Sequence, residues 1–426
     1  MSKRLKKIAK NEYIFSMMTK MISFSLGLIQ SVLLARFLGA ELKGVNAYIS
    51  SITSVGSIVI TFGMHQAYPY FRKKYGKDAI YQDYISLIMM VFAFYMIVAL
   101  LMAFFLPVSI ELKVAFILIP LLGYSHVVAY VTLIENPNVR NKWWTFIVIL
   151  DVLYVFVLWK FVERSLTWGI SILFFADALK CIVYTRQLHV KPRFHKGMEK
   201  MLKELLQFGF FPMLALVMTT LNYRIDVIML HGYSEITDAM IGVYSLGLSL
   251  SDKIIIITDT LKGVLVSKLS KGAEDNEVAK VSRLCFWSSL FLTLCIFVFG
   301  RWVIQLLYGS EFRGAYSVVL ITAVGVLSLN YFKLIAAYNV VNKHQVRNVA
   351  MLSIAILVDV VLNLMMIPRW GIQGAAFATS IGNLVCGIVF IIYFSKETSV
   401  RIAEMFLLQK SDLNLLRGVF KKKAKV

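Results

Sequence analysis

Long apolar stretches separated by short polar segments run through the whole chain. Each stretch holds roughly 20 residues or more, the length that a helix needs to cross a hydrocarbon layer about 30 Å thick. Because lipid offers the backbone no hydrogen-bonding partner, and because these runs are too long and too evenly apolar for barrel strands, they are expected to be helices. We count twelve, at residues 12–37, 45–69, 82–106, 112–135, 143–161, 165–185, 207–230, 239–261, 284–307, 315–341, 348–367 and 371–394. The pattern predicts an all-α integral membrane protein.

The positive charges follow the same alternation. Most of the 45 Lys and Arg residues fall in every second connecting segment, starting with the N-terminal one. Cytoplasmic segments of membrane proteins carry such an excess, and an error in the number of helices would have scrambled the alternation. We therefore predict twelve spans with both termini in the cytoplasm.

Composition narrows the function classes. The chain is 59% hydrophobic and only 16% charged, which excludes an ordinary soluble domain. The net charge of +21 lies in short segments beside the spans, so we expect anionic lipid headgroups as partners and no nucleic acid. A phosphate-binding loop for ATP is absent from the sequence, as are a soluble catalytic domain and the ligand spacing of a metal site. We expect no enzyme activity, no catalytic residues, no metal and no cofactor.

A polar, basic segment in mid-chain divides the helices six and six. This gives an N-terminal lobe at 1–185, a cytoplasmic linker at 186–206, a C-terminal lobe at 207–395 and a basic cytoplasmic tail at 396–426. Two pseudo-symmetric six-helix lobes around a central cavity are a common transporter plan.

Cations inside the predicted spans are the first candidate site. A charge at mid-bilayer costs roughly 2.5–3.5 kcal/mol on insertion scales, so it usually faces a cavity or a partner. We predict that a diphosphate binds to four of them: Lys20, Arg224, Lys253 and Lys333. In the alternative interpretation, Arg224 pairs with Asp226 or reaches towards the headgroups, Lys253 pairs with Asp252, and the pairs only hold helices in register.

Acidic and titratable side chains in the spans are the second candidate site. A buried carboxylate or imidazole can carry a proton or bind an ion, which would couple transport to a gradient. The candidates are Asp151, Asp177, Asp226, Asp359 and His126. The alternative is structural: pairing with Lys180, a hydrogen bond between Asp359 and Asn363 one turn on, and a role for His126 as an interhelical donor.

Several segments resemble the polysaccharide transporter family, a branch of the superfamily of multidrug, oligosaccharidyl-lipid and polysaccharide exporters. The segments follow one another along nearly the whole chain, although each is short. They are ARFLGAELKGV at 35–45, FGFFP at 208–212, NYRIDVIML at 222–230, LYGSEFRGAY at 307–316 and WGIQGAAFAT at 370–379.

The resemblance implies a flippase in the bacterial cytoplasmic membrane. Such proteins move undecaprenyl-diphosphate-linked repeat units of O-antigen, capsule or exopolysaccharide outward by alternating access, driven by a proton or sodium gradient, beside a polymerase and a chain-length regulator. Two alternatives from the same superfamily stay open. A multidrug exporter would be expected to carry an acidic residue where this chain has Lys20, and lipid II flippases typically have two further helices.

Overall fold

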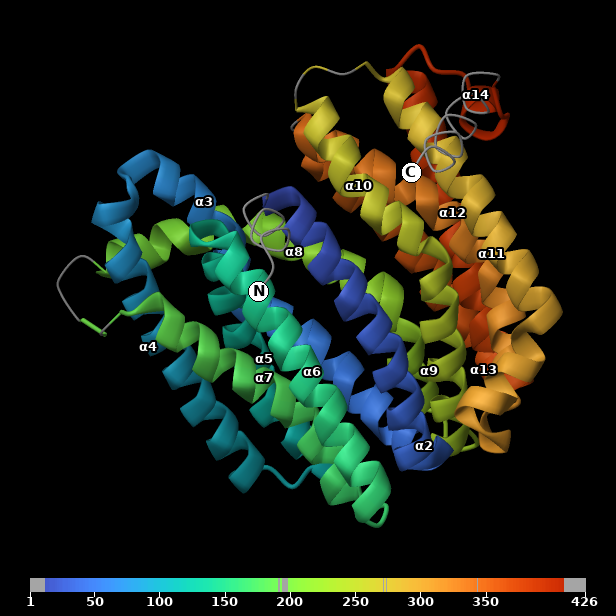
Figure 1. Cartoon of the computed structure of the whole chain (residues 1–426), viewed down its shortest axis with the longest axis horizontal. Helices are drawn as coiled ribbons and strands as arrows, with labels where there is room; N and C mark the ends of the chain where they lie inside the picture. The colour runs from blue at the N-terminus through green and yellow to red at the C-terminus, as the bar shows by residue number, and fades with distance from the viewer. Residues whose placement is uncertain are drawn as a thin grey trace, which may run out of the picture. The chain divides into compact units, whose positions relative to one another are not determined.

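The computed structural model describes residues 12–190, 192–193, 198–270, 272, 274–342 and 344–409. Throughout these residues the regular structure is helical, as the apolar runs predict, and Figure 1 shows the helices. The α-helices are α2 (Glu12–Thr61), α3 (Met64–Tyr75), α4 (Lys77–Phe105), α5 (Ile110–Glu135), α6 (Pro137–Phe161), α7 (Leu166–Leu188), α8 (Met198–His231), α9 (Asp238–Ser251), α10 (Ile256–Leu269), α11 (Asn276–Tyr308), α12 (Ala315–Val341), α13 (Gln345–Glu397) and α14 (Ile402–Phe406). Two short 3₁₀ segments are η1 (Asp252–Ile255) and η2 (Ser310–Phe312).

Ten helical segments in the described ranges are long and apolar enough to cross a membrane. Two of them, α2 and α13, hold 50 and 53 residues and contain a non-helical glycine, Gly39 with φ 69° and Gly371 with φ 56°. A positive φ favours glycine because it lacks a Cβ. At 1.5 Å per residue each of these helices is about 75 Å long, enough for two crossings. The lengths of α2 and α13 are compatible with twelve membrane spans, and that number stays a prediction.

Two predicted helices are interrupted. The run 45–69 is divided by a turn at Phe62 and Gly63, so that α2 ends at Thr61 and α3 begins at Met64. The run 239–261, expected to be one helix, is broken by η1 between α9 and α10. The apolar pattern continues through both breaks, which is why the sequence did not reveal them.

The chain forms two compact units. One comprises Met1–Thr220 with Thr237–Gly242, and the other Leu221–Ile236 with Val243–Val426. The unit boundary therefore falls within α8, between Thr220 and Leu221. The lobe boundaries at 185 and 207 remain a prediction from the sequence.

In the first unit, α2 packs against α5 and α6, and α5 also packs against α4 and α7. A core that includes the fully buried Tyr68 and Tyr84 joins α3, α4, α5 and α8. The first turn of α9 belongs to this unit and lies directly on α2. There a Cβ on Gly44 would stand 1.8 Å from the carbonyl oxygen of Asp238, and one on Gly242 would stand 1.9 Å from that of Ala40. The two backbones touch because both positions are glycine.

In the second unit, α12 is the central helix and packs against α10, α11 and α13. The residues after α13, 398–409, are called the C-terminal strap here and contain α14. The buried Arg283 of α11 donates to the carbonyl of Glu404 and, at 3.3 Å, to the side chain of Gln409. The strap is thereby held to α11.

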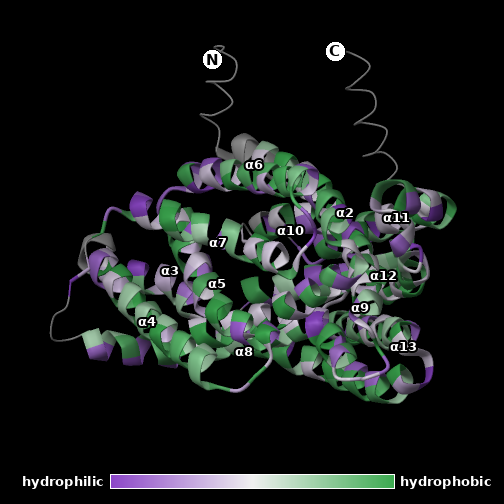
Figure 2. Ribbon diagram, turned by 90° about the horizontal axis from the view of Figure 1, so that it is seen from below, coloured by the Kyte–Doolittle hydropathy of each residue, from purple (hydrophilic) through white to green (hydrophobic). Residues whose placement is uncertain are grey.

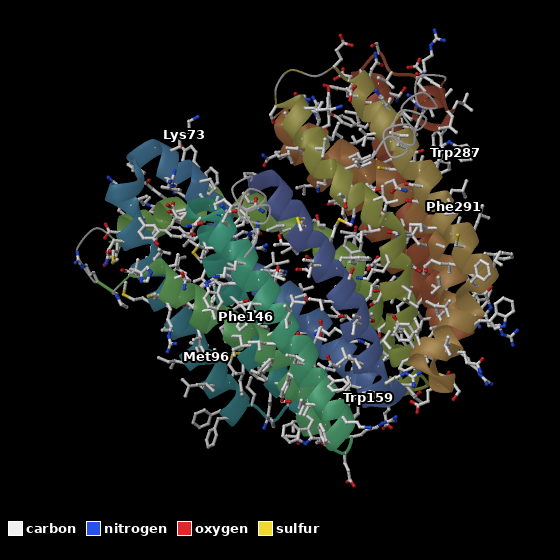
Figure 3. All side chains as sticks on the ribbon, viewed as in Figure 1. Lys73, Met96, Phe146, Trp159, Trp287 and Phe291 are labelled. Carbon is white, nitrogen blue, oxygen red and sulfur yellow. The ribbon has the colours of Figure 1, made fainter. Side chains whose placement is uncertain are left out.

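Large apolar side chains cover the outer helices. Trp287 and Phe291 point outward from α11, and Phe291 is 65% exposed. Phe104 and Phe161 are exposed to similar degrees. Figure 2 shows hydrophobic positions along helices such as α4 and α13. Aromatic surfaces of this kind suit hydrocarbon rather than water, and with the ten candidate spans they make this a multi-pass membrane protein.

Candidate functional site

Three of the four predicted cations meet in the second unit. Arg224 lies on α8, Lys253 on η1 and Lys333 on α12. All three interact electrostatically with the carboxylate of Asp252, which stands at the helix break. Residues far apart in the sequence thus form one charged group, which we call the cationic cluster: Arg224, Lys253, Lys333 and Lys262, with Asp252 and Asp259.

Lys333 has a defined partner within the cluster. Its Nζ lies 2.7 Å from Oδ1 and 2.9 Å from Oδ2 of Asp259 on α10. The Lys333 side chain is 17% exposed, whereas that of Asp259 is 53% exposed. The acid therefore lies on the accessible side of the lysine.

Tyr223 adds a polar group at the same place. Its ring centroid is 6.0 Å from the Lys333 ammonium, and its hydroxyl interacts electrostatically with Asp252 and Asp259. The hydroxyl oxygen is buried and has no hydrogen-bond partner among the described residues. An unsatisfied buried hydroxyl is uncommon and calls for an explanation.

Arg224 interacts electrostatically with Asp226, but the hydrogen bonds that Asp226 accepts in the described structure come from other residues. Asp226 is buried and accepts hydrogen bonds from the Tyr244 hydroxyl, from Thr379 at 3.2 Å and from the backbone N–H of Val227 at 2.8 Å. These bonds hold the carboxylate between α8, α9 and α13. The fourth predicted cation, Lys20, has a side chain outside the described part of the structure.

A second carboxylate lies near Asp226. Asp359 of α13 is 3% exposed and accepts a hydrogen bond of 3.1 Å from Asn363. This bond joins two side chains one turn apart on the same helix. Asp226 and Asp359 are close enough to repel each other electrostatically when both are ionised.

The remaining acidic candidates lie together in the first unit. Asp151 of α6 is buried, and its Oδ2 accepts a hydrogen bond of 2.5 Å from Gln30 of α2. Asp177 of α7 accepts from Ser125 at 3.1 Å and from Lys180 at 2.8 Å, so the predicted pairing with Lys180 is confirmed. His126 is exposed and interacts electrostatically with both members of that pair.

Sequence reasoning considered Asp252 only as a partner of Lys253, and it gave Tyr223 and Asp259 no role. It missed Tyr244 and Thr379 as partners of Asp226 altogether. Tyrosine and threonine are ordinary residues in membrane helices, and these two stand 18 and 153 positions from Asp226. The intramembrane acid itself was the signal that a donor had to be nearby.

Comparison with known proteins agrees with this architecture. A family model described as "Polysaccharide biosynthesis protein" matches residues 9–258, more than half of the chain. The chain belongs to this family. No curated protein sequence matches it.

Solved structures with the same fold are transporters. One, titled "Lipid II flippase MurJ, inward closed conformation", is 15% identical with a TM-score of 0.72 and covers 96% of this chain and 93% of its own. An inward-facing multidrug resistance MATE family transporter of the MOP superfamily is 12% identical with a TM-score of 0.66, covering 90% of this chain and 95% of its own.

A third is a MOP superfamily transporter from Pyrococcus furiosus whose title reports a reversed polarity of its binding pocket. It is 11% identical with a TM-score of 0.52, covering 94% of this chain and 96% of its own. This member of the polysaccharide biosynthesis family thus has the two-lobed fold of MOP-superfamily transporters.

Proposed function

We propose that this protein is a flippase that moves undecaprenyl-diphosphate-linked oligosaccharide repeat units of O-antigen, capsule or exopolysaccharide from the inner to the outer leaflet. The observation that carries the proposal is that Arg224, Lys253 and Lys333 all interact electrostatically with the Asp252 carboxylate in the second unit, where Lys333 also pairs with Asp259 at 2.7 Å. Family membership and the transporter fold support it.

The chemistry of the substrate explains the cluster. The diphosphate is the part of a lipid-linked sugar that is hardest to carry through hydrocarbon, because it is charged. Lysine ammonium groups and an arginine fork can replace its lost hydration by charge-assisted hydrogen bonds. Lys20 stays a candidate ligand from the sequence. We propose that transport proceeds by alternating access while the lipid tail stays in the bilayer.

Ion coupling is the second part of the proposal. Asp226 and Asp359 interact electrostatically, so binding of a proton or sodium ion to either carboxylate would relieve their repulsion. The Asp151, Asp177 and His126 group of the first unit is the other candidate. Transport into vesicles that is indifferent to both gradients would refute coupling at either place.

We further propose a bacterial cytoplasmic membrane location with both termini inside. The basic segments suit anionic lipid headgroups. A polymerase and a chain-length regulator are proposed partners, since exported units must be joined outside.

A lipid II flippase is the second candidate, favoured by the similarity to the MurJ structure. A multidrug exporter is the third, favoured by the MATE structure. A cluster in which cations outnumber acids suits an anionic cargo better than a cationic drug.

The deciding experiment measures surface polysaccharide and lipid-linked precursors in cells that lack the protein. Wild type, Lys20→Ala, Lys253→Ala and, as a control, Lys268→Ala are returned at equal expression. Lys268 pairs with Glu277 at 2.7 Å, outside the cluster. We expect cells that lack the protein to lose surface polysaccharide and to accumulate lipid-linked repeat units. Wild type and Lys268→Ala should restore the polysaccharide, whereas Lys20→Ala and Lys253→Ala should not. Accumulated lipid II would favour a lipid II flippase. Altered drug tolerance alone would favour a multidrug exporter.

A further inference from the structure

The ion pair between Lys333 and Asp259 has an unusual distribution of exposure. One ammonium contacts both carboxylate oxygens, at 2.7 and 2.9 Å. The lysine is the buried member and the acid the accessible one. Anything that reaches the Lys333 ammonium from the accessible side must therefore displace Asp259.

The ion pair with Asp259 also neutralises the Lys333 ammonium within a membrane span. Lys333 lies on α12, the span with the largest buried share in the described structure. An ammonium left there without a partner would be costly, because the surroundings cannot replace its hydration. A phosphate would neutralise it while substrate is bound, but the empty transporter needs another anion.

We propose that the Asp259 carboxylate occupies, in the empty transporter, the place at Lys333 that a substrate phosphate takes, and that it moves back when the substrate leaves. This inference rests on the proposed function, since it assigns the diphosphate to the cationic cluster. Asp259 then competes with substrate at Lys333 and neutralises the charge of Lys333 while the empty carrier returns.

The backbone next to Asp259 suits such a movement. The 3₁₀ segment η1 separates α9 from α10, and Asp259 lies in the first turn of α10. A 3₁₀ stretch within a helix often marks a hinge. A small rotation of α10 would carry Asp259 away from α12 without disturbing α9.

The groups around Asp259 fit both positions of its carboxylate. Lys262, one turn along α10, interacts with Asp259 and can retain it when Lys333 is taken by phosphate. The charge of Asp252 on η1 is offset by Arg224, Lys253 and Lys333, so Asp252 does not favour one position of the Asp259 carboxylate over the other. On α8, the buried Tyr223 hydroxyl is an unused donor near both acids. It can donate to the incoming phosphate.

Two effects of removing the carboxylate follow. Asp259→Asn keeps the shape of the side chain but cannot compete for Lys333, so it should bind a diphosphate more tightly. A partly exposed ion pair is worth up to about 1 kcal/mol, which corresponds to about a fivefold gain in affinity. The same variant should transport several-fold more slowly, because release is impeded and the empty carrier bears an extra charge.

The test uses the full-length protein in detergent, titrated with inorganic pyrophosphate by calorimetry, and the same variants in the transport assay. Asp259→Glu keeps the carboxylate and should resemble wild type in affinity. Lys333→Gln should bind more weakly than wild type. Glu277→Gln is the matched control: it removes one negative charge and a 2.7 Å ion pair with Lys268 outside the cluster, so it should leave both readings unchanged.

Tighter binding with slower transport for Asp259→Asn alone would support the exchange. If wild type binds pyrophosphate and Asp259→Asn binds it equally or more weakly, the exchange is refuted while the flippase proposal stands. If Glu277→Gln gains affinity as well, only the overall charge matters, and the exchange is again refuted. If wild type and Asp259→Asn both fail to bind pyrophosphate, the diphosphate site itself is refuted. Should Asp259→Asn not fold, normal or raised affinity in Lys333→Gln would refute the exchange.

Discussion

Replacing Gly44 by alanine should separate the start of α9 from α2. The added Cβ would stand 1.8 Å from the carbonyl oxygen of Asp238, and real Cβ atoms essentially never approach within 3.0 Å. The clash is with backbone, so no side-chain rotation can relieve it. The start of α9 and α2 must move apart by more than an ångström.

The loss of stability from the clash is partly offset, because alanine favours the helix more than glycine does. Overpacking in a close-packed region costs roughly 1–3 kcal/mol, while glycine to alanine within a helix returns up to about 1 kcal/mol. A net loss of about 1–2 kcal/mol is expected, or a fall in melting temperature of about 1–2 °C, because the entropy of unfolding grows with chain length. The Cβ added by Gly242→Ala would stand 1.9 Å from the carbonyl oxygen of Ala40, so this variant should lose a similar amount of stability. Because both act at one crossing, the double variant should lose less than the two losses added together.

The assay is thermal unfolding of purified protein in detergent, followed by the fraction that remains monodisperse. Gly27→Ala is the control: it lies on the same α2, and its added Cβ meets nothing within 4 Å, so it should melt at or above the wild-type temperature. Equal melting temperatures for Gly44→Ala and Gly27→Ala would show that the crossing is not tight and would refute the reasoning.

Three further predictions follow from other contacts. Arg283→Ala removes two of the hydrogen bonds that hold the C-terminal strap and leaves those that Trp287 donates to Phe406 and Tyr331 to Met405. Limited proteolysis should still cut the strap several-fold faster; unchanged cutting would contradict this. Gln30→Leu leaves the buried carboxylate of Asp151 without its donor and should cost roughly 1–3 kcal/mol in thermal unfolding, and adding Asp151→Leu should recover part of that loss. In a cysteine-free background, Lys73→Cys should react with an impermeant thiol reagent only after cells are opened, and Glu163→Cys in intact cells. The opposite result would invert the proposed orientation.

Parts of the candidate site could be derived from the sequence. An ionisable residue in an apolar run is conspicuous because its cost there is high, and this alone singled out Arg224, Lys253, Lys333, Asp226 and Asp359. Their grouping could not be derived, since helix packing decides which faces meet. The pairing of Lys333 with Asp259 joins residues 74 positions apart. Local periodicity carries no information about such a contact.

The sequence by itself determined the all-helical class, the membrane location and most helix ends, because the length of an apolar run and the lack of hydrogen-bonding partners in lipid leave the backbone little choice. Only the tertiary structure decided where a predicted span is broken, at Phe62 and Gly63 and at η1. It also decided which acid faces which cation. Hydropathy is a property of single residues, whereas a break or an ion pair depends on what a neighbouring helix presents, and that is fixed only when the helices pack.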